Sequence, residues 1–449
     1  MYKFILSFRY LLNKRVSYLA FLAVAICVFI VVVVITVMTG LTGEFRQANH
    51  SFAGDCIVGT ESLVGFAYYD EFANMLEKAD FIYAVSPLIK SYALISPDET
   101  DRSVGVEIMG IDAAKHSMAT GFGRTLHYRK ENTAKAFEPL YDPNLTGCVV
   151  GIDLWLQRDA RGRYFYGITP TKTALVISCF PLSAKGALSN AGTSLVNTKT
   201  FYYSDTSHSG LARVDGSTIY VPFEQAQMLC GMDGPDKRAS AICVTFKPSV
   251  KLTSGCKRVY SMWREFVQQK KGEQLADLLD GVSVQSWESY RRTFIAAMEK
   301  ERTVLIMMFT LMGITTVFIV FVVLYMVVGS KSKDIGILKS VGVSNIDVIE
   351  LFSGYAFLIG ISGSIFGMAG GWVFLRKING IESWLFEHFG FQLWDRTIYA
   401  IEDIPNQVDF KVLSVIMFSA VVACLAGAVV PSWRAAGLEP VETLQVSQL

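Results

Sequence analysis

Four long stretches of the chain contain no Asp, Glu, Lys or Arg and consist mostly of Val, Ile, Leu, Phe, Met and Ala. A helix needs about 20 apolar residues to cross the hydrocarbon of a bilayer. The pattern therefore predicts four transmembrane helices, at residues 16–40, 303–330, 351–375 and 412–433. The first stretch is longer than the apolar core of about 7–15 residues in a signal peptide, and no A-x-A site follows it, so we expect an uncleaved anchor.

The charges between these helices predict the topology. Basic residues favour the cytoplasmic side of a membrane. Four of them precede the first helix without any acid: Lys3, Arg9, Lys14 and Arg15. We therefore expect a cytoplasmic amphipathic helix at 1–15, a cytoplasmic segment at 331–350 and a cytoplasmic tail at 434–449. The 376–411 loop has more acids than bases and is expected outside.

Residues 41–302 form one large insertion between the first two helices, and its pattern is mixed. Short β-rich runs lie at 55–59, 104–111, 148–152, 174–180, 217–221 and 241–246, and amphipathic helical patterns lie at 69–79, 223–229 and 259–279. The predicted fold class is a membrane protein with four transmembrane α-helices and a large α+β extracytoplasmic domain between helices one and two.

Two parts of this domain have more than one interpretation. Residues 183–210 are rich in Ser, Thr, Gly and Asn, which predicts either a long functional loop or hairpin, or a mobile surface insertion. The helical pattern of 289–300 runs into the second span without Pro or Gly. It predicts a helix projecting from the membrane, either as a lever that carries force or as a simple stalk.

Composition excludes several classes of protein. Of the 449 residues, 51% are hydrophobic and only 18% are charged. A disordered chain has the opposite balance, and an ordinary soluble domain has about 25% charged residues. The net charge of +1 gives no electrostatic reason to expect a nucleic-acid partner.

The eight cysteines leave two alternatives open. Cys27 and Cys424 lie in predicted spans, and the other six lie in the outside domain: Cys56, Cys148, Cys179, Cys230, Cys243 and Cys256. In an oxidising compartment six cysteines can form up to three disulfides, with fifteen possible connectivities. Buried free thiols are the alternative. Zinc-ligand spacings do not occur in the sequence, so no metal site is expected.

The sequence carries no nucleotide-binding signature and no charge within its predicted spans. A P-loop requires a Gly-Lys dipeptide, and the chain has none. We therefore expect no cofactor in this chain and ATP hydrolysis, if it drives the protein, in a partner chain. Ion-coupled pumps keep ionisable residues within the membrane, so the charge-free spans argue against such a pump.

Three glycines of the third span are spaced by four residues: Gly363, Gly367 and Gly371. This spacing leaves one helix face nearly bare, so that another helix can pack close to it. The face serves either plain packing within one subunit or a helix that slides against a neighbour.

Two cytoplasmic segments carry a family resemblance. Residues 331–352, KSKDIGILKSVGVSNIDVIELF, and 431–444, PSWRAAGLEPVETL, resemble the permease family of the lipoprotein-releasing system, the macrolide exporter and the cell-division permease. Residues 398–410, IYAIEDIPNQVDF, resemble the lipoprotein-releasing branch. Asp334 stands where that family commonly has Glu, and Trp433 stands where it commonly has a basic residue.

The resemblance implies contact with an ABC ATPase subunit through a short cytoplasmic helix. The implied coupling residues are Lys333, Asp334, Ile335, Gly336, Ile337, Leu338, Lys339, Val341 and Gly342. Ile335, Leu338 and Val341 or Gly342 recur at helical spacing and predict an apolar stripe that lies in a groove of the partner. A helix on the lipid surface, with its lysines toward anionic headgroups, is the alternative.

The resemblance also implies the cargo and the remaining partners. It describes a permease of the bacterial inner membrane that extracts lipoproteins, paired with a second permease subunit and with membrane lipids around it. In one of the two releasing permeases an outside hairpin recruits the periplasmic lipoprotein carrier. By position this corresponds to residues 180–196, with Phe180, Pro181 and Leu182 as candidate contacts.

Other functions stay open at this point. A relative in the same superfamily exports a small molecule or peptide, or transmits a signal to an outside enzyme. Outside the superfamily, the chain would be a membrane-anchored binding module.

Overall fold

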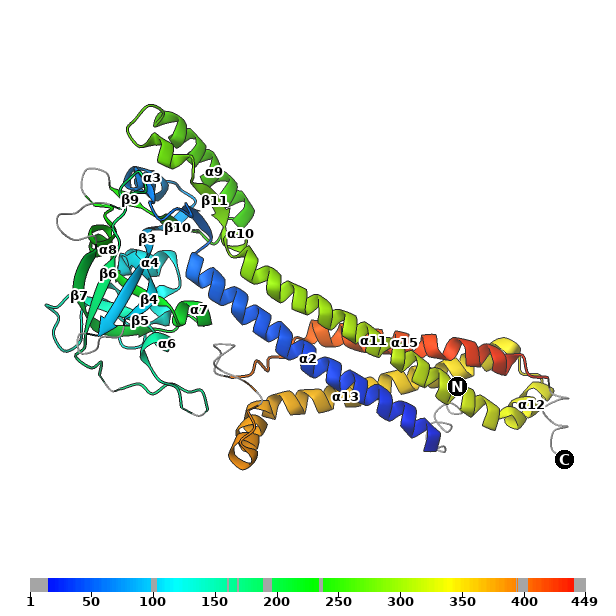
Figure 1. Cartoon of the computed structure of the whole chain (residues 1–449). Coiled ribbons are helices and arrows are strands. Elements are labelled where there is room, and N and C mark those ends of the chain that lie inside the picture. Colours follow the sequence, from blue (N-terminus) through cyan, green and yellow to red (C-terminus); the bar gives the residue numbers. More distant parts are fainter. Residues whose placement is uncertain are drawn as a thin grey trace. The chain divides into compact units, whose positions relative to one another are not determined.

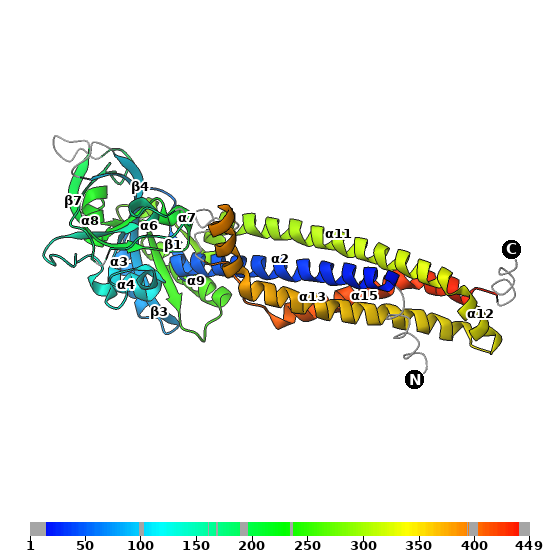
Figure 2. The ribbon, with the colours of Figure 1, turned by 90° about the horizontal axis from the view of Figure 1, so that it is seen from below.

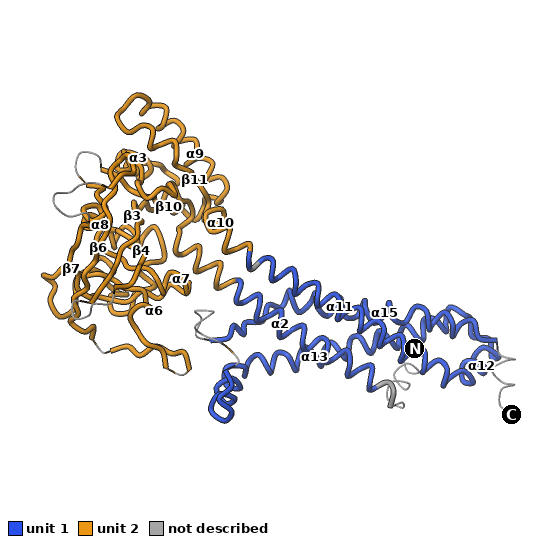
Figure 3. Tube along the Cα trace, viewed as in Figure 1, with its two compact units in different colours: residues 1–42, 297–393, 403–449 blue, residues 43–296, 394–402 orange. Residues whose placement is uncertain are grey.

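The computed structural model describes residues 15–97, 103–159, 161–167, 169–188, 196–233, 237–392, 394 and 403–439 (Figure 1). The chain divides into two compact units (Figure 3). The helical unit comprises Met1–Thr42, Ala297–Leu393 and Asp403–Leu449, and the sheet unit comprises Gly43–Ala296 and Trp394–Glu402. Parts of four predicted segments lie outside the described residues: 1–14, 189–195, 395–402 and 440–449.

Among the described residues, four helices are long and apolar enough to cross a membrane: α2 (Arg15–Ala53), α11 (Arg292–Ser330), α13 (Asn345–Phe389) and α15 (Phe410–Ala436). Within the helical unit they run side by side in both views (Figures 1 and 2). The short α12 (Ser332–Ser340) joins α11 to α13. Together with the sheet unit, these helices confirm the predicted fold class.

Helix α13 begins and ends at strong sequence signals. The Ser344 hydroxyl accepts the backbone N–H of Asp347, whose carboxylate accepts the backbone N–H of Ser344 in a capping box. Gly390 ends the helix in the left-handed conformation, at φ 64°. The helix thus continues past residue 375, into the segment expected as a loop, because the buried Ile378 and Glu382 keep these turns packed.

Helix α11 begins later than the 289–300 pattern predicts. A single turn, α10 (Trp287–Tyr290), comes first, and α11 starts at Arg292. The break is at Arg291, which leaves helical geometry while its guanidinium Nε donates to Asn49 Oδ1 at 2.7 Å. The predicted continuous helix is therefore wrong in its first turn.

The sheet unit contains a nine-stranded mixed sheet in the order β11-β1-β10-β3-β4-β8-β5-β7-β6. The long β3 (Ile82–Pro97) pairs with β10 at its start, then with β4 on one side and β6 on the other. The strands β3-β4-β8-β5-β7-β6, in this spatial order, therefore close into a ring. The β4–β8 and β5–β7 pairs are parallel and the other pairs are antiparallel.

The remaining elements of the sheet unit have the following bounds. The strands are β1 (Cys56–Gly59), β2 (Phe66–Ala67), β4 (Val104–Ile111), β5 (Gly147–Gly151), β6 (Ala174–Cys179), β7 (Asn197–Ser207), β8 (Thr218–Pro222), β9 (Arg238–Ala239), β10 (Ala241–Phe246) and β11 (Ser283–Ser286). The helices are α3 (Tyr69–Glu77), α4 (Ala113–Ala119), α5 (Phe122–Thr125), α6 (Ile152–Trp155), α7 (Ala212–Asp215), α8 (Phe223–Cys230) and α9 (Leu252–Gln269).

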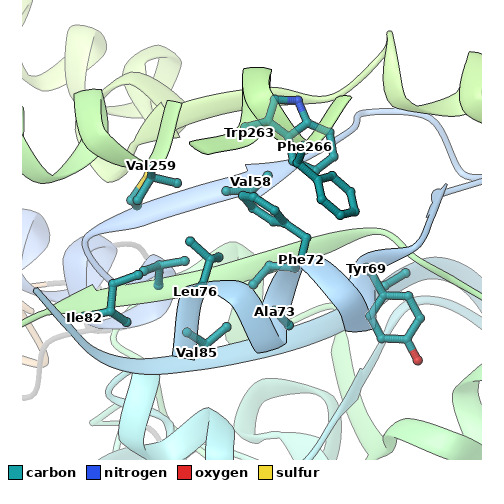
Figure 4. Close-up of a cluster of buried hydrophobic side chains, with 14 of the residues drawn as sticks. Val58, Tyr69, Phe72, Ala73, Leu76, Ile82, Val85, Val259, Trp263 and Phe266 are labelled. Atoms are coloured by element: carbon teal, nitrogen blue, oxygen red, sulfur yellow. The ribbon is translucent and has the colours of Figure 1, made fainter. Parts of the chain in front are cut away.

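Large apolar side chains fill the interior of this unit. Figure 4 shows α3 and α9 enclosing one core, where Trp263 packs edge-on against Phe72 with 4.8 Å between ring centroids. A second core lies on the face of the ring strands that α8 covers, and a third packs α4 and Trp287 against the sheet. Helix α8 approaches β4 closely because Gly110 has no side chain: a Cβ there would lie 2.2 Å from the Cβ of Ala226.

Candidate functional site

The three spaced glycines of α13 lie against α2. A Cβ at Gly367 would come within 2.5 Å of the carbonyl oxygen of Ala25, and one at Gly363 within 2.8 Å of Val24. A Cβ at Gly371 would lie 3.0 Å from a methyl group of Val32. The bare face of α13 is thus occupied by the backbone of a neighbouring helix of the same chain.

Two further glycines continue this close packing to the other two long helices. Gly360 of α13 meets Cys424 of α15, where a Cβ would lie at 3.2 Å. Gly427 of α15 meets α11, where a Cβ would lie 2.6 Å from the carbonyl oxygen of Val317. The packing therefore runs from α2 to α13, α15 and α11.

A cavity of about 450 Å³ lies between α2, α11 and α15. Its lining contains no Asp, Glu, Lys, Arg or His. The hydroxyls of Thr310, Thr316 and Ser419 donate to backbone carbonyls of their own helices at 2.8–2.9 Å. The cavity therefore presents an apolar surface, formed by Val24, Cys27, Val28, Val31, Ile35, Ile306, Phe309, Gly313, Ile314, Val317, Val415, Ile416, Ala420 and Ala423.

Sequence reasoning did not identify this cavity. The helices that line it are apolar on all sides, so periodicity does not show which faces meet. Gly313 was a possible signal, because it is a small residue in an otherwise bulky stretch, and a Cβ there would meet nothing within 4 Å.

The α12 segment differs from the predicted docking stripe. Ile335 is 2% exposed, and Gly336 beside it is also buried. Ile335 and Leu338 border a small pocket with Val348 and Phe352 of α13. The predicted stripe therefore packs largely inside its own chain, because the start of α13 folds back over that face of α12.

Val341 of the predicted stripe is exposed, and so are two apolar residues outside the stripe, Ile337 and Ile346. Ile337 is 53% exposed, Val341 81% and Ile346, in the first turn of α13, 68%. Ile337 and Val341 are four residues apart, so they share one side of α12. Gly342 turns the chain toward α13 in a left-handed conformation, at φ 101°.

The charged residues of this segment have different partners. Lys333 is exposed. Lys331 forms an ion pair with Asp334 at 2.5 Å. The ammonium of Lys339 donates to the carbonyl oxygens of Ala436 and Leu438 at 2.7 and 2.8 Å. Lys339 therefore holds the C-terminal end of α15 to α12.

The segment before α15 is held by two of the other long helices. The side-chain amide of Asn379 in α13 accepts the N–H of Ile404 at 2.9 Å and donates to its carbonyl at 3.4 Å. Pro405 lies on α2 at Gly40, where a Cβ would be 2.4 Å from the proline Cβ. Part of the 398–410 motif therefore packs against α2 and α13.

Of the three candidate carrier contacts, only Phe180 is exposed, at 49%. It borders a groove of about 390 Å³ together with Tyr92, Leu94 and Arg213. Pro181 is buried, and Leu182 donates its N–H to Cys230 while its carbonyl accepts from the buried Arg238 at 2.8 Å.

The buried Asp205 of the sheet unit is held by backbone groups. Asp205 accepts the backbone N–H groups of Tyr128, Arg129, His127 and Thr206; burial raises its pKa, and these hydrogen bonds oppose the shift. Among the described residues, no three His, Cys, Asp or Glu side chains are grouped so that they could hold a metal ion.

Comparisons with known proteins match part of the chain by sequence. Residues 306–440 match the family model "FtsX-like permease C-terminal". The lipoprotein-releasing system transmembrane protein LolC of Xylella fastidiosa is 28% identical over 162 residues, which cover 36% of this chain and 39% of that protein. The corresponding LolE of Haemophilus influenzae is 25% identical over 165 residues, covering 36% and 39%. The match thus spans about two fifths of these curated relatives.

One solved structure is similar to part of the chain. The periplasmic region of MacB from Actinobacillus actinomycetemcomitans is 13% identical, with a TM-score of 0.31, over 56% of this chain and 97% of that chain.

Proposed function

We propose that this chain, whose residues 306–440 are an FtsX-like permease domain, is the transmembrane subunit of an ABC transporter that extracts lipoproteins from the inner membrane. A separate ATPase subunit hydrolyses the ATP, and the cargo passes to a periplasmic carrier. In this proposal both termini lie in the cytoplasm and the sheet unit lies outside. Four candidate membrane helices and relatives named for lipoprotein release support it.

The observation that carries the proposal is the apolar cavity between α2, α11 and α15. Its volume of about 450 Å³ lies within the range of about 300–1,000 Å³ of small-molecule sites. The hydroxyls on its wall already donate their hydrogens to carbonyls of their own helices, so they offer a polar solute no further donor. The acyl chains of a lipoprotein need only apolar contact, and we propose that they enter here.

Glycine substitutions test this proposal with a matched control. Gly313 lines the cavity and Gly329 does not, and a Cβ at either position meets nothing within 4 Å. Gly313→Leu should therefore fill the cavity without blocking helix packing, and should lower lipoprotein release from spheroplasts at least tenfold. Gly329→Leu should release lipoprotein as the parent does. Equal release by both variants, at equal amounts in the membrane, would contradict the proposal.

We propose that the ATPase contacts the exposed Ile337, Val341 and Ile346, with Lys333 beside them. These apolar side chains lie at the end of the helical unit where α12 connects two candidate spans. A partner groove that covers them would bury the apolar surface that the chain itself leaves open.

Co-purification tests this contact. The double change Ile337→Asp, Val341→Asp should abolish recovery of the ATPase with the permease, because it puts two charges on the docking surface. Ser340→Asp adds a charge to the same exposed helix without removing an apolar contact, and should keep most of the complex. Ile335 is unsuitable for this test because a charge there would disturb the fold itself. A complex that survives the double change would rule out this docking surface.

The other proposed partners follow from exposed apolar surface. A second permease subunit would cover part of the exposed faces of α11 and α15, which present Met307, Leu311 and Phe418. The lipoprotein carrier would contact the groove bordered by Phe180. Phe180→Asp should weaken carrier binding while leaving ATPase binding unchanged, as measured by pull-down with each partner.

A further inference from the structure

Four of the six cysteines in the sheet unit form two contacting pairs. Cys256 packs against the core that contains Cys56, and Cys179 and Cys230 share another core; in each pair the two thiols lie within hydrogen-bonding reach. All eight cysteines of the chain are thiols in the structure. Pairs 200 and 51 residues apart in sequence have thus been brought together by the fold.

The first pair joins α9 to the sheet. Cys56 opens β1 and is completely buried. Cys256, Val259, Trp263 and Phe266 recur at helical spacing on one side of α9, and this side packs in the same core as Cys56. Cys256 itself is only partly buried. Cys256 is therefore the more exposed cysteine of this pair.

The second pair joins α8 to the end of β6. Cys179 is the last residue of β6 and Cys230 the last of α8, and both are buried. Leu182 donates its N–H to the carbonyl of Cys230 at 3.1 Å. Asn197, the strand partner of Cys179, donates its side-chain amide to the carbonyl of Leu229 at 3.3 Å. Hydrogen bonds to the backbone of α8 thus hold the segments around these two cysteines together.

Sheet register separates Cys243 from Cys56. Val244, not Cys243, lies opposite Cys56, and side chains alternate between the faces of a strand. Cys243 therefore points to the opposite face, where it belongs to a different core.

Cys148 is too far from Cys179 to bond with it. Cys148 lies opposite Tyr203 of β7, and Cys179 lies opposite Asn197 of the same strand. Six residues of strand span about 20 Å, whereas the Cα atoms of a disulfide lie within about 7 Å.

We propose that Cys56–Cys256 and Cys179–Cys230 are disulfide bonds in the mature protein, and that Cys148 and Cys243 stay reduced. The inference rests on the proposed function in one respect: the sheet unit must lie outside the cytoplasm, where disulfides persist.

The bonds form by exchange with a dithiol-disulfide oxidant protein. The thiolate of Cys256 attacks the oxidant's disulfide, forming a mixed disulfide and releasing one oxidant thiolate. The thiolate of Cys56 then attacks the sulfur of Cys256 and releases the second. The two protons of the cysteine thiols pass to these two thiolates, so the oxidant gains two electrons and two protons.

The electrostatics within each pair favour this attack. The hydrogen bond from Cys56 lowers the pKa of Cys256. The hydrogen bond from Cys179 lowers the pKa of Cys230, and the Ser91 hydroxyl and the charge of Arg238 act in the same direction. A lower pKa raises the thiolate fraction available at neutral pH. Because Cys179 and Cys230 are both buried, their bond must form before the domain closes around them.

The second bridge has a consequence for the proposed carrier contact. Cys179 immediately precedes Phe180, so a bond to Cys230 anchors the base of that segment to α8. The disulfide would then fix the backbone next to the exposed Phe180 ring to the end of α8.

Differential alkylation of the full-length protein tests the proposal. Cells are quenched in acid, and the protein is denatured and blocked with N-ethylmaleimide, reduced, and labelled with a maleimide of different mass. We expect Cys56, Cys179, Cys230 and Cys256 to take the second label, and the other four cysteines the first. The proposal would be overturned if all eight cysteines were blocked by N-ethylmaleimide in the first step. It would also be overturned if Cys148 or Cys243 took the second label.

Single variants check the connectivity. Cys256→Ser should move Cys56 alone to the first label, and Cys230→Ser should move Cys179 alone. Cys243→Ser serves as the control and should leave the protected set unchanged. Reduction of the parent should lower its melting temperature by about 5–15 °C.

A reporter cysteine separates this proposal from the proposed orientation. Glu61 is exposed in the sheet unit, and Glu61→Cys should react with a membrane-impermeant maleimide in spheroplasts. If it reacts while all native cysteines are free, the disulfides are wrong and the orientation stands. If it does not react and the native cysteines are free, the orientation is wrong, and the disulfides fail with it.

Discussion

The two units of this protein bury their interiors in opposite ways. In the sheet unit, large side chains such as Phe72, Trp263 and Phe266 fill the space between helices and sheet. In the helical unit, glycines such as Gly367 and Gly427 let backbones touch, and a cavity of about 450 Å³ stays open. Water drives large apolar groups together, whereas lipid is as apolar as Leu, so close backbone packing holds membrane helices together instead.

The largest expected effect comes from emptying the sheet unit's core. Trp263→Ala should lower the free energy of unfolding by about 3–5 kcal/mol, because it removes a buried ring and leaves a cavity. Tyr260, one turn earlier on α9, is 51% exposed, and Tyr260→Ala should change it by less than about 0.5 kcal/mol. Denaturant unfolding followed by hydrogen exchange of α9 measures both. Similar values for the two variants would mean that this core is not tightly packed.

A pH-dependent effect should also be confined to the sheet unit. Burial lowers the pKa of His116 to about 4, and its ring contacts the Ser86 hydroxyl at 3.1 Å. Because this pKa lies below the ordinary value of about 6.5, the neutral ring stabilises the fold above pH 6.5. That stability, about 3 kcal/mol, is lost as the pH falls from 6.5 to 4.

The matched variant for this prediction is His116→Gln, which does not titrate. The carboxyls of Asp205 and Asp215, whose pKa values burial raises, titrate in both proteins. The difference in melting temperature between parent and variant should therefore shrink from pH 7 to pH 4.5. A constant difference across this range would show that His116 does not ionise there.

In the helical unit, adding a single methyl group should destabilise the fold, as removing a large side chain does in the sheet unit. Gly367→Ala places a Cβ 2.5 Å from a carbonyl oxygen of α2, and should destabilise the helical unit by about 1–3 kcal/mol. Gly380 lies on the same helix with nothing within 4 Å, so Gly380→Ala should be neutral or stabilising by up to about 1 kcal/mol. Thermal unfolding in detergent compares them, and equal stability would mean that α2 and α13 pack less closely.

The membrane helices and several strands were predictable because their signals are local. Charge-free length identifies a span regardless of its neighbours, and the runs at 104–111 and 241–246 coincide with β4 and β10. The long β3 was missed because Lys90, Ser91 and Tyr92 interrupt its apolar pattern. Strand β7 lies in the 183–210 region and pairs antiparallel with β6, as the hairpin alternative allows, but the polar residues Asn197, Thr198, Lys199 and Thr200 at its start hid its bounds.

The candidate sites were less predictable because they depend on which faces meet. The period of α12 showed an apolar side but not that α13 covers it, so Ile335 was assigned to a partner that cannot reach it. The cysteine connectivity likewise required strand register, because fifteen pairings are equally compatible with the sequence. The glycine spacing of α13 correctly indicated close helix packing, since a Cβ at each of these glycines would crowd α2.

The hydrogen bonds of Lys339 have a mechanical consequence. Helix α12 is continuous in sequence with α11 and α13, and Lys339 adds α15 through the carbonyls of Ala436 and Leu438. Helices α11, α13 and α15 are therefore all joined to α12 at this end. A load applied to α12 is distributed over α11, α13 and α15 in parallel, while α2 receives it through its side contacts, such as the glycine contacts of α13 and the Pro405 contact at Gly40.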